Sequence, residues 1–129
     1  MITRRKNELN YSMNIEAKLR SEFDAEEGSF LLKIRCELEW DREKFKAATS
    51  AMYKAADEWR QRDSIPRWIA QGFWYFETFV PTWTSHPNFP RPESEYYHTS
   101  VQLIRDLSYF LFIGESLYED DTLEKLSLG

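Results

Sequence analysis

Two stretches in the first third of the chain alternate between apolar and polar residues. From position 9 to position 19 the odd positions are apolar or aromatic and the even positions are polar. From position 30 to position 40 the same alternation returns with the apolar residues at even positions. A period of two residues is typical of a strand with one buried face. The pattern therefore predicts a long antiparallel β-hairpin of residues 9–20 and 29–40, with residues 24–28 as its turn.

The opposite parity of the two stretches restricts how they can pair. Like charges directly opposite each other destabilise a sheet, so we favour the register that pairs Glu16 with Arg35. A second interpretation of the later stretch stays open. Leu31, Ile34 and Leu38 also recur at helical spacing, so residues 30–40 form a helix in that interpretation.

The remainder of the chain has the period of α-helices. Asp41 is a suitable N-cap for a helix over residues 42–62. Pro66 fits the first turn of a second helix over residues 65–80, and Gly114 fits the end of a third over residues 93–113. Four prolines between positions 81 and 92 predict a stiff, irregular loop between the last two helices.

These elements predict one α+β domain over residues 1–129, in the order ββααα. A lone hairpin is only marginally stable, so we expect the three helices to cover its apolar face. A chain of 129 residues can bury its own core, and an aromatic content of 16% is not typical of a disordered chain. The two edges of the hairpin stay unpaired, which favours a homodimer through a hairpin edge.

Charge and cysteine content exclude several classes of function. A formal net charge of -5 argues against direct binding of nucleic acid, which needs a basic face. No stretch has the length of apolar sequence that a membrane span requires, and no signal-type apolar run follows the basic residues near the N-terminus. We therefore expect a cytoplasmic protein.

The single cysteine, Cys36, lies on the apolar face of its predicted strand, where we expect it to be inert.

Trp74 is the most conspicuous candidate for a contact surface. It lies on the polar side of the second predicted helix, and exposed tryptophans concentrate at the centres of protein interfaces. Together with the acidic charge, it predicts a small binding protein without catalytic activity. An inhibitor, an immunity protein or an antitoxin-like protein would fit, with a basic protein as partner.

The alternative is a small enzyme or ligand-binding domain built on a polar cluster of the third helix. Glu95, His98 and Arg105 are spaced so that their side chains meet on one helix face. A histidine held by a carboxylate can act as a general base, and an arginine can bind an anion. The competing interpretation is a solvated helix face, which we favour because no nucleophile motif accompanies the cluster.

The proline-rich loop supplies the other candidate residues. Trp83, His86, Phe89 and Arg91 lie within nine positions of one another and form either a ligand pocket or aromatic pins that hold the loop on the helices. Two histidines are too few for a convincing metal site, and no motif for a phosphate, metal or cofactor is present. We therefore expect neither a metal nor a cofactor.

Overall fold

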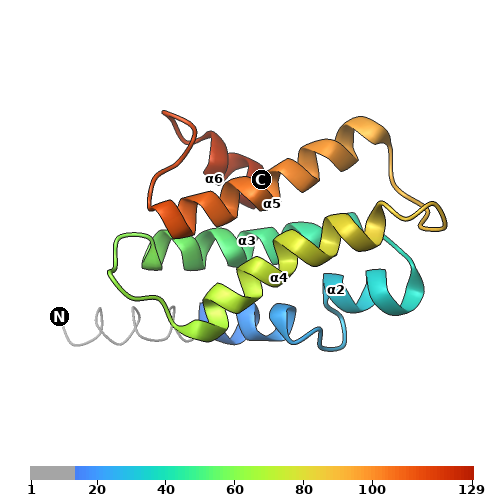
Figure 1. Cartoon of the computed structure of the whole chain (residues 1–129), viewed down its shortest axis with the longest axis horizontal. Coiled ribbons are helices and arrows are strands. Elements are labelled where there is room, and N and C mark those ends of the chain that lie inside the picture. Colours follow the sequence, from blue (N-terminus) through green and yellow to red (C-terminus); the bar gives the residue numbers. More distant parts are fainter. Residues whose placement is uncertain (1–13) are drawn as a thin grey trace.

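The computed structural model describes residues 14–129, and every regular element in that part of the chain is a helix (Figure 1). No strand occurs among these residues, so the predicted α+β class is wrong and the fold is a helical bundle. Residues 14–23 are helical. The elements that follow are α2 (Phe30–Leu32), η1 (Lys33–Glu37), α3 (Arg42–Trp59), α4 (Arg67–Thr84), α5 (Ser94–Ile113) and α6 (Thr122–Leu128).

The first predicted strand fails because its alternation also satisfies a helical period. Ile15, Leu19 and Phe23 all occupy odd positions, but they are also four residues apart and so share one face of a helix. Ile15 is the only β-branched residue between 14 and 23, and strands favour such residues. Residues 9–13 of the predicted strand lie outside the described residues. A dimer through the hairpin edge has no strands to pair within the described chain.

The second predicted strand is also a helical segment, formed by α2 and η1. The Ser29 hydroxyl accepts a hydrogen bond from the Leu32 amide at 3.2 Å and so caps the N-terminus of α2. Phe30 and Leu31 are both fully buried, although a strand would direct them to opposite faces. The helical interpretation of this stretch is therefore correct for residues 30–37, and the helix ends before Leu38. Cys36 is exposed, so its predicted place in the core is wrong.

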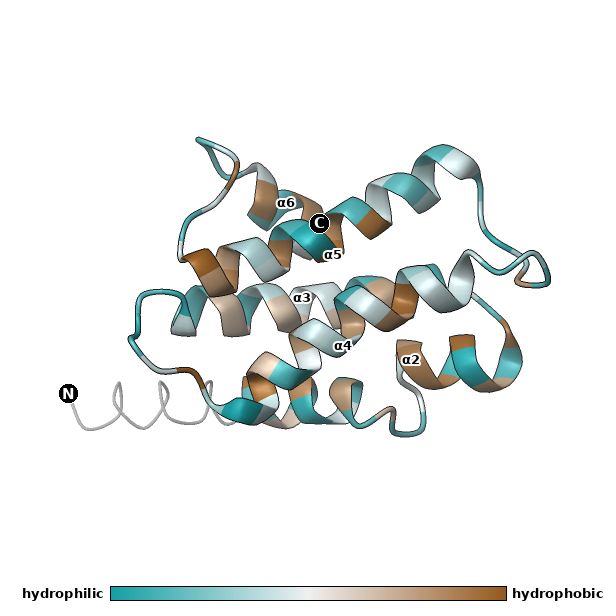
Figure 2. Ribbon diagram, in the orientation of Figure 1, coloured by the Kyte–Doolittle hydropathy of each residue, from teal (hydrophilic) through white to brown (hydrophobic). Residues whose placement is uncertain are grey.

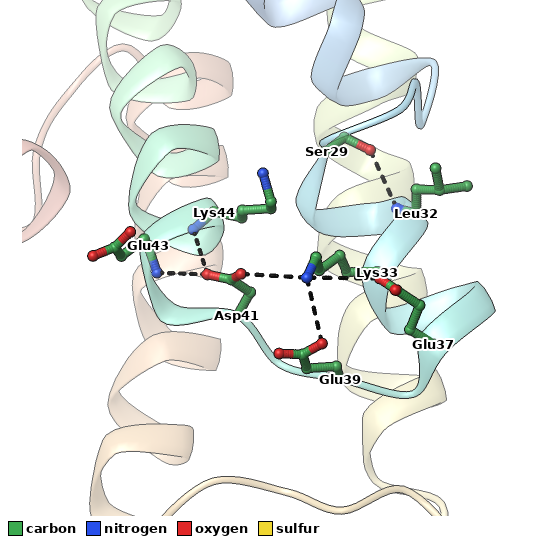
Figure 3. A network of polar contacts seen from close by, with 8 residues as sticks. All are labelled: Ser29, Leu32, Lys33, Glu37, Glu39, Asp41, Glu43 and Lys44. Atoms are coloured by element: carbon green, nitrogen blue, oxygen red, sulfur yellow. Dashed lines mark hydrogen bonds and ion pairs between the residues drawn. The ribbon is translucent and has the colours of Figure 1, made fainter.

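The three predicted helices are present with shifted ends. The Asp41 carboxylate accepts hydrogen bonds from the Glu43 and Lys44 amides and caps α3, as Figure 3 shows. Gly114 ends α5 with a φ of 87°, a conformation that favours glycine. The second helix continues through Pro81 to Thr84, so the predicted loop is shorter than expected. The proline ring fixes a φ close to the helical value, but it removes the N–H of position 81 and crowds the carbonyl four residues earlier, so the sequence predicted an end of the helix there.

Helices α3, α4 and α5 form the centre of the bundle. In Figure 1, α4 crosses α3, and α5 with α6 lies on the side away from α2. The rings of Phe73 and Phe112 lie 6.4 Å apart, and the hydroxyls of Thr84 and Tyr97 lie 2.7 Å apart, so α4 and α5 run antiparallel. Figure 2 shows much of α4 in pale colours, because tryptophan and tyrosine have intermediate hydropathy. Its aromatic rings nevertheless supply a large part of the core.

The helical segment 14–23 packs on α4 through one aromatic side chain. The Phe23 ring contacts Phe73 and Phe76 edge-on or tilted, with centroid distances of 5.6 and 6.3 Å. It lies directly over Gly72, where a Cβ atom would overlap the ring. Arg20 places its guanidinium 3.9 Å from the centre of the Trp68 ring. Gly72 therefore permits the close approach of the two helices.

Glu22 makes the stability of this junction depend on pH. The side chain is buried, with 6% of its surface exposed, and its Oε2 accepts a hydrogen bond from the Phe30 amide at 3.4 Å. Burial raises the pKa of Glu22 above its ordinary value, although the Phe30 amide, Lys18 and Lys44 oppose the shift. The unfolded chain therefore releases this proton at a lower pH than the folded chain. Stability is lost as the pH rises from the unfolded to the folded pKa.

We predict that Glu22→Gln has a higher free energy of unfolding than the wild type at pH 7. At pH 4 the two free energies of unfolding should differ less. Glutamine retains an acceptor for the Phe30 amide and removes the buried charge. Urea denaturation at the two pH values measures the effect, and the difference between variant and wild type isolates Glu22 from the other carboxyl groups. Equal destabilisation of the variant at both pH values would contradict this role of the buried charge.

Candidate functional site

An apolar pocket lies where the C-terminal end of α4 meets the segment after η1. Its volume is about 410 Å³, within the range of ligand pockets in proteins. Three of the predicted site residues line it together. We call it the Trp83 pocket, and its lining residues are Leu38, Phe79, Thr82, Trp83, His86, Asn88 and Phe89.

Ring stacking and one hydrogen bond hold the aromatic walls of this pocket in place. The Phe79 ring is stacked between Tyr75 and Trp83, with centroid distances of 5.0 and 5.5 Å. The indole Nε1 of Trp83 donates a hydrogen bond to the Ile34 carbonyl at 2.8 Å, which ties α4 to η1. Phe89 is 4% exposed and so anchors the loop in the core. The pocket is therefore formed before any ligand arrives.

The loop that closes the pocket is held by its own polar groups. The His86 Nδ1 accepts a hydrogen bond from the Asn88 amide at 3.1 Å, so the neutral ring carries its proton on Nε2 and can donate there. Arg91 donates from Nη1 to the Thr84 and His86 carbonyls, each at 3.1 Å. Arg91 therefore braces the loop and does not line the Trp83 pocket.

Leu38 has a conformation that leucine rarely adopts. It follows the last residue of η1 with φ 52° and ψ 41°, in the left-handed region where glycine or asparagine is usual. Its side chain is also 44% exposed, yet it forms one wall of the Trp83 pocket. Residues in strained conformations cluster at functional sites. Leu38 therefore carries both backbone strain and an exposed apolar group at the mouth of the pocket.

Charged side chains cluster around Lys33, in the segment next to Leu38. The Lys33 ammonium lies 3.7 Å from Glu37, 3.4 Å from Glu39 and 3.7 Å from Asp41, as Figure 3 shows. The hydrogen bond to Glu39 raises the pKa of Lys33. A second cation, Arg35, lies 5.9 Å from the centre of the Phe79 ring. The three carboxylates thus share Lys33, and Lys44 also acts on Asp41, so the charges of this cluster largely offset one another.

The predicted cluster on the third helix is not assembled with the Trp83 pocket. The His98 Nδ1 donates a hydrogen bond to the Ser94 carbonyl at 2.8 Å. His86 lines the Trp83 pocket, whereas His98 lines two other pockets. Glu95 and Arg105 are exposed, and neither forms an ion pair with another described residue.

One part of the predicted polar cluster does come together. Arg91 and His98 line a shared pocket of about 420 Å³ at the N-terminal end of α5, with Ser85, Pro92, Ser94 and Tyr97. Tyr97 is held there by a hydrogen bond from its hydroxyl to Thr84, whose own hydroxyl donates to the Val80 carbonyl.

Trp74 is exposed, as expected, but it does not belong to the Trp83 pocket. Its side chain is 62% exposed. Trp83 follows nine positions later in the same helix, which amounts to about two and a half turns. The two indoles therefore project from opposite sides of α4. A contact surface that combines Trp74 with the proline-rich loop is not formed.

A second site, which the sequence patterns did not predict, presents a buried carboxylate from α5. Asp106 is 4% exposed and lines a pocket of about 300 Å³, which we call the Asp106 pocket. His98, Gln102 and Asp106 recur every four residues on α5, and this spacing is the signal that could have identified the site. Helical spacing could not have identified Tyr118, because it lies beyond the end of α5 and reaches Asp106 only through the folding of the chain.

Three searches of this chain gave negative results. Within residues 14–129 no group of three or more His, Cys, Asp or Glu side chains is placed to hold a metal ion. None of the described helices combines the length and apolarity needed to cross a membrane. Comparisons of this chain with protein-family models, with curated proteins and with solved structures found no match.

Proposed function

We propose that this protein is a non-catalytic binding protein of the cytoplasm, which acts by occupying another protein. In this proposal the Trp83 pocket receives an apolar side chain of the partner. The observation that supports it best is Leu38, which maintains an exposed apolar wall in a strained conformation. A purely structural helix end would be more stable with glycine at that position.

The expected partner presents its apolar side chain on a basic surface. The net charge of -5 favours the approach of a basic protein. His86 adds one hydrogen-bond donor at the pocket, which suits a main-chain carbonyl of the partner. An inhibitor, an immunity protein or an antitoxin-like protein would act by such contacts. The enzyme hypothesis lacks comparable support, because its two histidines line different pockets.

A pair of glycine substitutions tests the proposal. We expect Leu38→Gly to abolish binding in the pocket while its free energy of unfolding stays within about 1 kcal/mol of the wild type, because relief of backbone strain offsets the lost side chain. Ala25→Gly is the matched control. Ala25 has a φ of 53° and does not line the pocket, so the same backbone change should leave binding intact.

The binding probe is a short acetylated peptide with one phenylalanine between lysines. Its counterparts carry alanine in place of the phenylalanine, or glutamates in place of the lysines. We expect the first peptide to shift the NMR signals of the Trp83 indole N–H and the Leu38 amide in a saturable titration, with both counterparts weaker. Trp74→Ala should not change this result. Equal shifts from the alanine peptide, or unchanged binding by Leu38→Gly, would refute the proposal.

A further inference from the structure

Asp106 is a buried carboxylate without a cationic partner in the described chain. Its Oδ1 accepts a hydrogen bond from the Gln102 side chain at 2.9 Å, and its Oδ2 accepts one from the Tyr118 hydroxyl at 2.8 Å. Both donors are neutral, and none of the ion pairs among residues 14–129 includes Asp106. Buried charges in proteins are normally paired with an opposite charge.

The carboxylate keeps room for a further hydrogen bond. An ionised carboxylate has about four acceptor positions, and the described contacts of Asp106 use two of them. The side chain also lines an open pocket of about 300 Å³, so a ligand can approach it. The hydrogen bond to Asp106 raises the pKa of Tyr118, which keeps the phenol protonated and donating.

The other walls of the Asp106 pocket suit an aliphatic chain. Leu103 is almost fully buried, whereas Leu126 from α6 is 43% exposed at the edge of the pocket. His98 also lines this pocket, and because its Nδ1 donates to the Ser94 carbonyl, Nε2 is the acceptor atom of the neutral ring. The pocket thus combines a buried anion, a second acceptor and apolar walls.

We infer that the Asp106 pocket binds an organic cation, an ammonium or guanidinium group carried on an aliphatic chain. The charged head donates a hydrogen bond to the Asp106 carboxylate, and the aliphatic stem contacts Leu103 and Leu126. A metal ion fits less well, because no third acidic or histidine ligand is placed beside Asp106 and His98 among the described residues. This inference rests on the Asp106 pocket alone and does not depend on the Trp83 pocket.

Titration of the labelled protein with n-butylammonium, n-butylguanidinium and neutral 1-butanol tests the inference. We expect both cations to give saturable shifts in the NMR signals of residues 98–106 and 118–126, and 1-butanol to bind at least about tenfold more weakly. Equal binding of the alcohol, or no saturable shift with either cation, would overturn the inference. These arms use the wild-type chain and so do not depend on the folding of any variant.

Two variants of matched shape separate charge from hydrogen bonding. Asp106→Asn removes the charge and should weaken binding of both cations at least about tenfold. Tyr118→Phe removes one donor but keeps the carboxylate, so it should still bind them. Circular dichroism checks that both variants are folded. A folded Asp106→Asn protein with wild-type affinity would show that the carboxylate does not bind the cation.

A peptide arm distinguishes the two sources of such a cation. A short peptide with an internal lysine is compared with n-butylammonium in the same titration. If the peptide shifts the same signals with equal or higher affinity, the natural ligand is a side chain of a partner protein. If only the free amine enters, the ligand is a small molecule. Either result supports a cation site.

Discussion

Phe30→Ala is expected to lower the free energy of unfolding by about 3–5 kcal/mol. The Phe30 ring is fully buried and lies 4.9 Å from Trp40, 5.1 Å from Phe45 and 6.0 Å from Phe76, measured between ring centroids. It joins the short segment α2 to α3 and α4. Alanine would leave a cavity among three rings that other elements hold in place, so collapse around it would be limited.

Urea denaturation followed by circular dichroism measures this effect, and Phe112→Ala provides the control. Phe112 is 45% exposed at the end of α5, so its removal should cost less than about 1.5 kcal/mol. Similar losses for the two variants would mean that Phe30 does not occupy the core. In that case residues 30–37 would not pack as the structure describes.

Gly72→Ala is expected to destabilise the protein by about 1–3 kcal/mol. In an open helix the same change would stabilise it by about 1 kcal/mol, because alanine has the higher helix propensity. Here the new methyl group would overlap the Phe23 ring, so the ring or the segment 14–23 that carries it would have to move. The sign of the effect therefore reports whether these two helices are in contact.

A double-mutant cycle with Phe23→Ala completes the test. Removal of the ring creates space, so Gly72→Ala should become neutral or stabilising in that background. The free energies of unfolding of the four proteins, from urea denaturation, give the coupling between the two positions. Additive effects, or a stabilising Gly72→Ala in the wild type, would show that Phe23 does not pack on Gly72.

The sequence predicts the later helices well because their end signals are local. Asp41 caps a helix through amides two and three residues away, and Gly114 supplies the positive φ that ends another. The early segments fail for a physical reason. Ile15, Leu19 and Phe23 satisfy the period of a strand and that of a helix at once, so periodicity alone cannot decide between them. The scarcity of β-branched residues, which favours a helix, was the more informative signal.

The candidate site was predictable only as far as its residues are close in sequence. Trp83, His86 and Phe89 line one pocket because the end of α4 and the following loop bring them together. Leu38 reaches the same pocket through the packing of η1 against α4, which no local pattern reveals. Tyr118 likewise reaches Asp106 only after the chain turns back toward α5.

The most direct test of both the fold and the Trp83 pocket is a nuclear Overhauser spectrum of the isotopically labelled protein. We predict cross-peaks between the Trp83 indole N–H and Ile34, together with helical Cα shifts for residues 30–37. Extended Cα shifts over these residues, with cross-strand peaks between Glu16 and Arg35, would contradict both the helical bundle and the pocket.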